Sequence, residues 1–222
     1  MKTRARRKAE RPGEILEAAF DAFAERGFAA TRMEDVAARA GVTKGAIYFY
    51  FETKERLFEE TVSHYSQTML ADAGAMLASI EGGSAEKLRA FLQYLYSRCA
   101  YDRYGRDLIG LMVSDGRNFP QLVERHHRDF FAPAMGMVSD LLAAGAASGD
   151  FRPEIVAHGA EIAVAPSVFL SLMRLIFGAS LALDEEAYIA CHIDLLLQGL
   201  LTPKGRKNLS AGKACGEGRA PI

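Results

Sequence analysis

Residues 31–58 constrain the fold more than any other part of the chain, because their pattern predicts two short helices joined by a tight turn. The first helix carries Val36, Ala37 and Ala40 on one small apolar face. Gly41 can end that helix, since glycine adopts the left-handed backbone conformation without a Cβ clash. Two short helices at a glycine turn favour a compact all-helical unit at this end of the chain.

Three threonines mark the expected helix starts in this stretch. Thr31 precedes Glu34 by three residues, which is the spacing of a capping box that would open the first helix. Thr43 can cap the second helix, over about residues 44–50, and Thr53 can cap a third. Helix, glycine-containing turn and helix form the helix-turn-helix, whose second helix enters the major groove of DNA.

The start of the second predicted helix has the side chains that a DNA-reading helix needs. Thr and Lys can hydrogen-bond to base edges or phosphates, and Gly lets the backbone come close. We predict base or backbone contacts from Thr43, Lys44, Gly45 and Tyr48. We predict phosphate contacts from Thr31, Arg32, Tyr50 and Lys54. The alternative is an ordinary helical hairpin with buried tyrosines.

These positions give the first quarter of the chain a resemblance to the tetracycline-repressor (TetR) family of bacterial regulators. The resemblance rests on a string of apolar, glycine, aromatic and lysine positions: Ile15, Ala18, Phe23, Gly27, Thr31, Val36, Ala37, Ala40, Gly41, Val42, Gly45, Tyr48, Phe51, Lys54 and Leu57. It implies a three-helix DNA-binding head, a long fourth helix, an all-helical ligand-binding body and a homodimer that usually represses transcription. It implies neither operator nor ligand, because the body varies between members.

The charges divide the chain into a basic head and an acidic body, although the net charge is only −1. Residues 1–54 hold eleven Lys and Arg against eight Asp and Glu, whereas residues 55–202 hold eleven against nineteen. A basic head orients a protein toward a polyanion, although a mixed surface can show such an asymmetry by chance. Residues 1–11 are either a basic arm for phosphates or the minor groove, or a solvated terminus.

We therefore expect three regions along the chain. Residues 1–54 form the helix-turn-helix DNA-binding domain with its basic arm, and residues 55–202 form a helical effector-binding and dimerisation domain. Residues 203–222, rich in Gly, Lys and Ala, form a disordered tail. No strand-like alternation stands out, so the fold class is all-α, with the head on a long connecting helix over residues 54–80.

The most apolar stretch, residues 162–183, is long enough for a transmembrane helix. Arg174 near its middle and Pro166 favour a helix buried on several sides instead. Three widely spaced cysteines, Cys99, Cys191 and Cys215, fit a reducing compartment, and no signal-peptide pattern opens the chain. We therefore expect a cytoplasmic protein without a membrane partner.

Catalytic and metal-binding motifs are not evident in the sequence. His126 and His127 are adjacent, so on a helix they point about 100° apart and grip one metal poorly. The sequence shows no nucleophile elbow, phosphate-binding loop or zinc-protease motif. We expect no enzyme, no cofactor and no metal, with an enzyme hidden in the body as a less favoured alternative.

The body supplies candidates for a ligand pocket and for a dimer interface. Aromatic, methionine and thiol side chains can line an apolar pocket, although each can equally be packed core: Tyr94, Cys99, Met112, Phe130, Phe131, Met135, Phe169, Met173 and Phe177. The last two helices, over residues 154–180 and 184–201, are expected to pair with their copies. The interface candidates are Ile189, Ile193, Leu196, Leu197 and Leu200.

Together these features predict a homodimeric, sequence-specific regulator of double-stranded DNA. We expect a repressor that leaves a palindromic operator when a small, largely apolar effector binds. The alternative is a helical DNA-binding adaptor that answers to a protein partner rather than to a small molecule.

Overall fold

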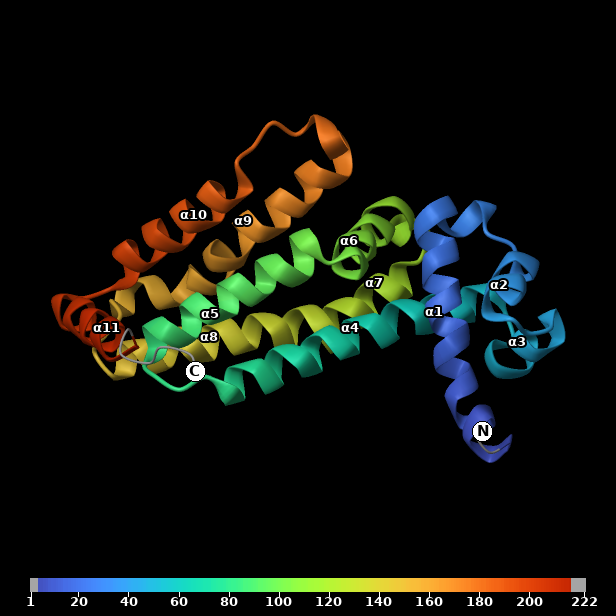
Figure 1. Ribbon diagram of the computed structural model, residues 1–222, viewed down its shortest axis with the longest axis horizontal. Helices are drawn as coiled ribbons and strands as arrows, with labels where there is room; N and C mark the ends of the chain where they lie inside the picture. Colours follow the sequence, from blue (N-terminus) through green and yellow to red (C-terminus); the bar gives the residue numbers. More distant parts are fainter. Residues whose placement is uncertain (1–3, 217–222) are drawn as a thin grey trace, which may run out of the picture. The chain divides into compact units, whose positions relative to one another are not determined.

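The structure is a computed structural model that describes the backbone of residues 4–216 and the side chains of residues 11–209. Within this part of the chain the only strand-type pairing is an isolated bridge between Phe151 and Leu201, so the predicted all-α class is confirmed. The longer helices are shown in Figure 1 and are α1 (Arg4–Ala30), α2 (Met33–Ala40), α3 (Lys44–Phe51), α4 (Lys54–Ser79), α5 (Ser84–Tyr96), α6 (Arg103–Asp115), α7 (Pro120–His126), α8 (Ala132–Ala147), α9 (Val156–Phe177), α10 (Glu185–Leu200) and α11 (Pro203–Gly216).

The chain divides into two compact units. The first, here called the head, comprises Met1–Thr68 and Asp107–Phe130, and the second, the body, comprises Met69–Arg106 and Phe131–Ile222. This division differs from the predicted boundary at residue 54. The head keeps the first half of α4 and gains a segment far along the sequence, which no local pattern in residues 1–54 indicates.

An aromatic cluster explains why the distant segment belongs to the head. The ring centroid of Phe119 lies 4.5 Å from that of Phe28 and 5.1 Å from that of Phe58. Asp115, which is buried, accepts a hydrogen bond from the Phe28 backbone N–H at 3.4 Å and another from Ser114 Oγ at 2.9 Å. Burial of these rings stabilises the head, since each large aromatic side chain removes 150–250 Å² from water in typical cores.

The turn between α2 and α3 has the geometry that the sequence predicts. Gly41 has φ 63° and ψ 34°, a left-handed conformation in which a side chain is strained. Thr43 is the N-cap of α3, and its Oγ1 accepts a hydrogen bond from the Ala46 N–H at 3.2 Å. Thr53 Oγ1 accepts from the Arg56 N–H at 3.0 Å at the start of α4. These caps satisfy N–H groups that have no partner within their own helices.

The start of α2 corrects one expectation. Its N-cap is Arg32, not Thr31, and the Arg32 N–H donates to Asp35 Oδ2 at 3.3 Å. Thr31 instead lies buried, with its Oγ1 2.7 Å from the Gly27 carbonyl and 3.0 Å from the Ala22 carbonyl. Gly27 has φ 71° and kinks the end of α1, which turns its carbonyl out of the helical ladder and toward the threonine.

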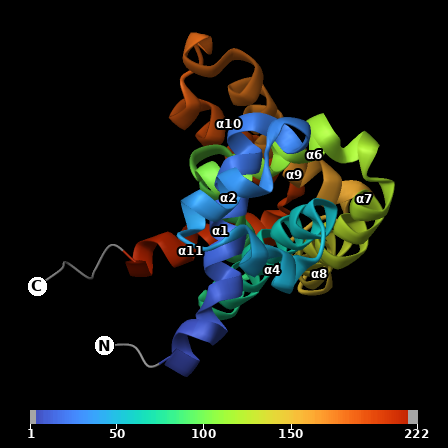
Figure 2. The same ribbon diagram turned by 90° about the vertical axis from the view of Figure 1, so that its right-hand side faces the viewer.

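The body is built around packed contacts among α5, α8 and α9, with α10 against α5 (Figure 1). Its core consists of apolar side chains from these helices and from the Phe151 turn: Leu88, Phe91, Leu92, Val138, Leu142, Phe151, Ala160, Ala163, Val164, Ile193, Leu197 and Leu200. Both views show the connection between α9 and α10 projecting beyond the other helices of the body (Figure 2). That connection therefore has few neighbours of its own in a single chain.

Two short π-helical segments interrupt the helical path, at Ser97–Tyr101 (η1) and at His127–Phe131 (η3). A π-turn closes its hydrogen bond over five residues rather than four, so it accommodates one extra residue. Pro133 is the second residue of α8, so its missing N–H falls where the wider turn of η3 passes into the α-helix. The helical path therefore continues through Pro133 by way of a wider turn, without a loop.

The chain after residue 202 departs from the predicted disordered tail, because Pro203–Gly216 form α11. Thr202 Oγ1 accepts a hydrogen bond from the Gly205 N–H at 3.1 Å, and Lys204 Nζ donates to the Ser148 carbonyl at 2.6 Å. Leu209 packs against the body core. Residues 217–222 lie outside the described part of the chain. The predicted N-terminal arm also differs, since α1 begins at Arg4.

By length and composition, two helical stretches are apolar enough to cross a bilayer, Pro120–Ala147 and Pro153–Ser180. Core helices of soluble proteins meet the same criteria. Within the second stretch Ala163 and Leu170 are fully buried, and Arg174 Nε lies 2.7 Å from Glu185 Oε1. This packing and ion pairing favour the core-helix interpretation that the sequence suggested.

Candidate functional site

The second helix of the helix-turn-helix, α3, has one buried face and one exposed face. Ile47 is fully buried and Phe51 is 6% exposed, so these two side chains fix α3 to the head. Tyr48 and Phe49 are 40% and 73% exposed. A short helix that has large exposed side chains opposite its packed face can lie in the major groove of DNA.

The N-terminal turn of α3 is open at Gly45, where the sequence predicts that the backbone can come close to DNA. A Cβ built on Gly45 would meet nothing nearer than Thr43 Oγ1 at 4.0 Å, and Gly45 is exposed. Because Thr43 Oγ1 already accepts a hydrogen bond within the helix, its hydroxyl hydrogen remains the group that could be donated outward. Thr43, Lys44, Gly45 and Tyr48 therefore share one exposed end of the head.

Lys44 is joined to α2 by an ion pair. Its Nζ lies 2.5 Å from Glu34 Oε1, and both side chains are exposed. The hydrogen bond between them raises the pKa of Lys44 and lowers the pKa of Glu34. In this structure Lys44 is therefore fully charged at neutral pH, and a DNA contact by its ammonium exchanges one anionic partner for another.

The four predicted phosphate contacts differ in their surroundings. Arg32 is exposed at the N-terminus of α2, and Tyr50 is half-buried beside the exposed Phe49 ring, with the two ring centroids 5.2 Å apart. Lys54 Nζ donates to the Ala29 carbonyl at 3.2 Å and lies 4.4 Å from the centroid of the Phe28 ring.

Thr31 is the one of these four that the structure corrects. Its side chain is 1% exposed and its hydroxyl faces backbone carbonyls, so it supports the head and cannot reach a phosphate. Phe49 is a further exposed residue of α3, and the helix-turn-helix motif does not single it out. Its position two residues after Ile47, on the side of the helix away from the core, was the available signal.

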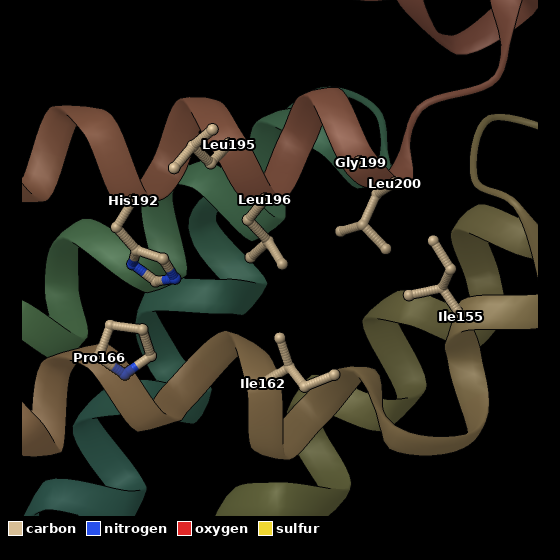
Figure 3. A pocket seen from close by; sticks show the side chains of 8 residues that line it. All are labelled: Ile155, Ile162, Pro166, His192, Leu195, Leu196, Gly199 and Leu200. Carbon is tan, nitrogen blue, oxygen red and sulfur yellow. The ribbon is translucent and has the colours of Figure 1, made fainter.

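The body has an open apolar pocket between α9 and α10, with a volume of about 340 Å³ (Figure 3). Its lining is aliphatic except for one imidazole: Ile155, Ile162, Pro166, His192, Leu195, Leu196, Gly199 and Leu200. His192 Nδ1 lies 2.9 Å from the hydroxyl of Tyr96, and burial lowers the pKa of His192. A neutral imidazole thus lines this pocket at neutral pH.

None of the nine predicted ligand-binding residues lines this pocket. Met112 and Phe130 belong to the head, and the other seven belong to the body. Phe131, Phe169 and Phe177 are 44%, 51% and 51% exposed in the single chain, so they do not surround an enclosed cavity there. The remaining four are more enclosed within the body and are Tyr94, Cys99, Met135 and Met173.

Two of these enclosed residues have hydrogen-bonding or titration properties that bear on a ligand. The Tyr94 hydroxyl donates to the Met69 carbonyl at 3.3 Å. Burial raises the pKa of the Cys99 thiol to about 12, so this thiol stays neutral and unreactive at neutral pH. Either side chain could offer a polar contact within apolar surroundings, but neither is arranged as a nucleophile.

Three of the five residues predicted for the dimer interface on α10 lie in the body's own core. Ile193, Leu197 and Leu200 are 3%, 2% and 1% exposed and belong to the body's own core. Ile189 and Leu196 are partly buried against the same core. The exposed apolar side chains of α9, α10 and their connection are different ones: Ile162, Phe169, Leu175, Ile176, Phe177, Leu183 and Leu195.

Other titratable clusters in the described residues are small. A cavity of about 10 Å³ lies beside His126, whose Nδ1 is 3.1 Å from Ser66 Oγ, and burial lowers the pKa of His126. Within the described residues, no group of three or more His, Cys, Asp and Glu side chains could hold a metal ion. The exposed end of α3 in the head is therefore the arrangement that indicates a function.

Comparison with known proteins bears on this arrangement. Residues 15–61 match the model of bacterial regulatory proteins of the tetR family. The transcriptional repressor KstR2 of Rhodococcus jostii (strain RHA1) is 25% identical over 201 residues, which make up 88% of this chain and 94% of KstR2. The transcriptional activator FasR of Mycolicibacterium smegmatis is 29% identical over 100 residues, or 45% of each chain.

Among solved structures, FadR from Bacillus subtilis in complex with stearoyl-CoA has a similar fold. Its TM-score is 0.71 at 19% sequence identity, and the match covers 84% of this chain and 98% of FadR. The family match falls on the helix-turn-helix, and the structural likeness extends the shared all-α fold through the body. Residues 15–61 of this chain therefore carry the helix-turn-helix of tetR-family regulatory proteins, and the chain as a whole shares the all-α fold of solved regulators of that type.

Proposed function

We propose that the protein is a cytoplasmic, homodimeric repressor that binds a near-palindromic operator and leaves it when a largely apolar small molecule binds the body. The observation that carries this proposal is the exposed face of α3, with Tyr48 and the Thr43–Lys44–Gly45 turn on the side opposite buried Ile47. A two-fold protein reads two-fold sites, with successive reading helices about 34–36 Å apart on B-DNA.

The reading helix is tested by footprinting on a duplex selected from a random pool by the wild-type protein. Lys44→Ala should weaken operator binding by about 1–3 kcal/mol if Lys44 contacts a base. Tyr48→Ala should also shrink the protected region. As a matched control, Arg89→Ala removes a charge from α5 of the body and should leave the footprint unchanged. Full operator affinity in both Lys44 and Tyr48 variants would move the reading surface elsewhere.

The dimer is supported by the exposed apolar side chains on α9 and α10. Ile162 is 57% exposed and Leu195 66% exposed, and both line the open groove of Figure 3. Single exposed apolar residues are ordinary, but a contiguous group marks an interaction surface. A second copy of α9 and α10 against this face would form a four-helix interface, and a stable dimer buries more than about 1,000 Å² in total.

The effector is proposed to bind within the body, near the enclosed residues Tyr94, Cys99, Met135 and Met173. These provide mostly apolar contacts with a hydroxyl and a thiol among them, which suits a largely apolar ligand. A fatty acyl-CoA and a steroid are reasonable first probes. FadR, which shares the fold, holds stearoyl-CoA, and another fold neighbour is described as the ketosteroid regulator KstR2 of Mycobacterium tuberculosis.

Release of DNA by the ligand is tested through the thermodynamic linkage between ligand binding and operator binding. A ligand that releases DNA with a coupling free energy of about 1–3 kcal/mol must itself bind more weakly, by the same factor, to the operator complex. The measurement is the affinity of each probe for the free dimer and for the dimer saturated with operator duplex. Equal affinities for every bound probe would contradict induction and would favour regulation by a protein partner.

A further inference from the structure

The outermost side chain of α3 belongs to a residue that no predicted contact explains. Side chains advance by about 100° per residue around a helix. Buried Ile47 and Phe51 therefore place Phe49 on the opposite side of α3, pointing away from the head. Phe49 is 73% exposed, the largest exposed fraction among the large apolar side chains of the described chain.

The surface around Phe49 leaves its ring free to meet a partner. Gly45 lies one turn earlier on the same face, and it has no side chain. A Cβ built on Gly45 would meet no side-chain atom of Phe49 within 4 Å, so the surface next to the ring is open to a partner. The Tyr50 ring packs edge-on against Phe49, with an interplanar angle of 84°, and restricts the ring.

The chemistry of a phenyl ring limits what it can recognise on DNA. It has no hydrogen-bond donor or acceptor for base edges, and a phosphate offers it no favourable contact. The apolar group that the major groove displays is the 5-methyl of thymine, and contact with it distinguishes A·T from G·C pairs. Burial of the exposed ring against that methyl removes apolar surface from water on both sides.

We propose that Phe49 is a specificity-determining residue, whose ring contacts the 5-methyl group of one thymine in each operator half-site. The proposal rests on the proposed function, because it requires α3 to lie in the major groove. It adds a direct readout of thymine to the polar contacts of Thr43, Lys44 and Tyr48.

The test replaces thymine by deoxyuridine, which removes the methyl and keeps every hydrogen-bonding group. Duplexes selected by the wild-type protein from a random pool are resynthesised with deoxyuridine at one symmetric pair of positions at a time. At one such pair the wild type should lose roughly fourfold in affinity per methyl, or about sixteenfold for the two half-sites.

The variant Phe49→Ala and the deoxyuridine substitution together form a double-mutant cycle. Its affinity for the thymine duplex should fall, and deoxyuridine at the sensitive pair should cost it nothing more. Tyr48→Phe, on the neighbouring position of the same helix, should retain the wild-type deoxyuridine profile. Because Phe49 is exposed, Phe49→Ala should also unfold at the wild-type temperature, which separates a lost contact from a damaged head.

Two results would overturn the proposal while leaving the regulator intact. One is a wild-type profile in which no thymine methyl matters, and the other is a sensitive methyl that Phe49→Ala still detects. A failure of the proposed function is distinct, since the wild-type protein would then select no duplex above non-specific binding, and the readout by Phe49 would fall with it.

Discussion

At the scale of single residues, two glycines of α8 have opposite surroundings. A Cβ on Gly145 would lie 2.0 Å from Phe151 Cδ2, whereas a Cβ on Gly136 would meet nothing within 4 Å. Phe151 is fully buried, so its ring cannot move aside. Gly145 permits the close approach of the turn at Phe151 to α8, and Gly136 has no such steric requirement.

These two positions give a paired prediction on stability. Gly145→Ala should lower the free energy of unfolding by about 1–3 kcal/mol or more, through overpacking against Phe151. Gly136→Ala should raise it by up to about 1 kcal/mol, because alanine is the better helix former. Urea denaturation followed by circular dichroism measures both. An equal effect of the two substitutions would mean that Phe151 does not pack on α8 as described.

The scale of residues also shows what the sequence could and could not predict. Gly41 and Thr43 have strong local signals, a left-handed turn and an N-cap, and both were placed correctly. The capping-box spacing of Thr31 was misleading, because Gly27 offered its hydroxyl a backbone carbonyl in the interior. A short motif predicts which bonds are possible locally, and the tertiary packing decides which of them form.

At the scale of elements, α10 also shows that a sequence pattern predicts local structure but not what that structure packs against. Its apolar periodicity predicts an amphipathic helix correctly, but it does not say whether the apolar face meets the chain's own core or a second copy. Ile193, Leu197 and Leu200 meet the core. Leu195, on the other side of the helix, is 66% exposed and is therefore available to a partner. Composition likewise gives no direction, so it could not indicate that Phe131, Phe169 and Phe177 are 44%, 51% and 51% exposed in the single chain.

Two neighbouring leucines of α10 therefore separate assembly from folding. Leu195→Glu should leave helicity unchanged, because this side chain is exposed, and should convert the dimer to monomer by burying an unpaired charge. Leu197→Glu should unfold the body, since Leu197 is 2% exposed. Sedimentation and circular dichroism distinguish the two outcomes. A Leu195→Glu variant that stays fully dimeric would place the interface elsewhere.

At the scale of the whole molecule, the charge distribution predicts how binding depends on salt. The chain is almost neutral, with a net charge of −1, but its first 54 residues are basic and residues 55–202 are acidic. Such a molecule attracts DNA with one part and repels it with the other. Non-specific affinity should therefore fall steeply as salt rises, since each phosphate contact releases counterions.

Arg32 provides the quantitative test at this scale. It is exposed at the start of α2, without the carbonyl and ring contacts that hold Lys54. Arg32→Ala should reduce the slope of log affinity against log salt by about 0.9 per subunit, or about 1.8 per dimer. Fluorescence anisotropy between about 50 and 200 mM salt measures it. An unchanged slope would remove Arg32 from the phosphate contacts.

The two π-helical segments have a consequence for comparing this chain with its relatives. Each wide turn at Ser97–Tyr101 and His127–Phe131 holds one residue more than an α-turn would. A relative with a regular α-helix at either place would carry one residue fewer, and its alignment should show a single-residue gap there. Every downstream side chain on that helix would otherwise rotate by about 100°. Alignments that spread such gaps elsewhere would assign the wrong face of α8 to the core.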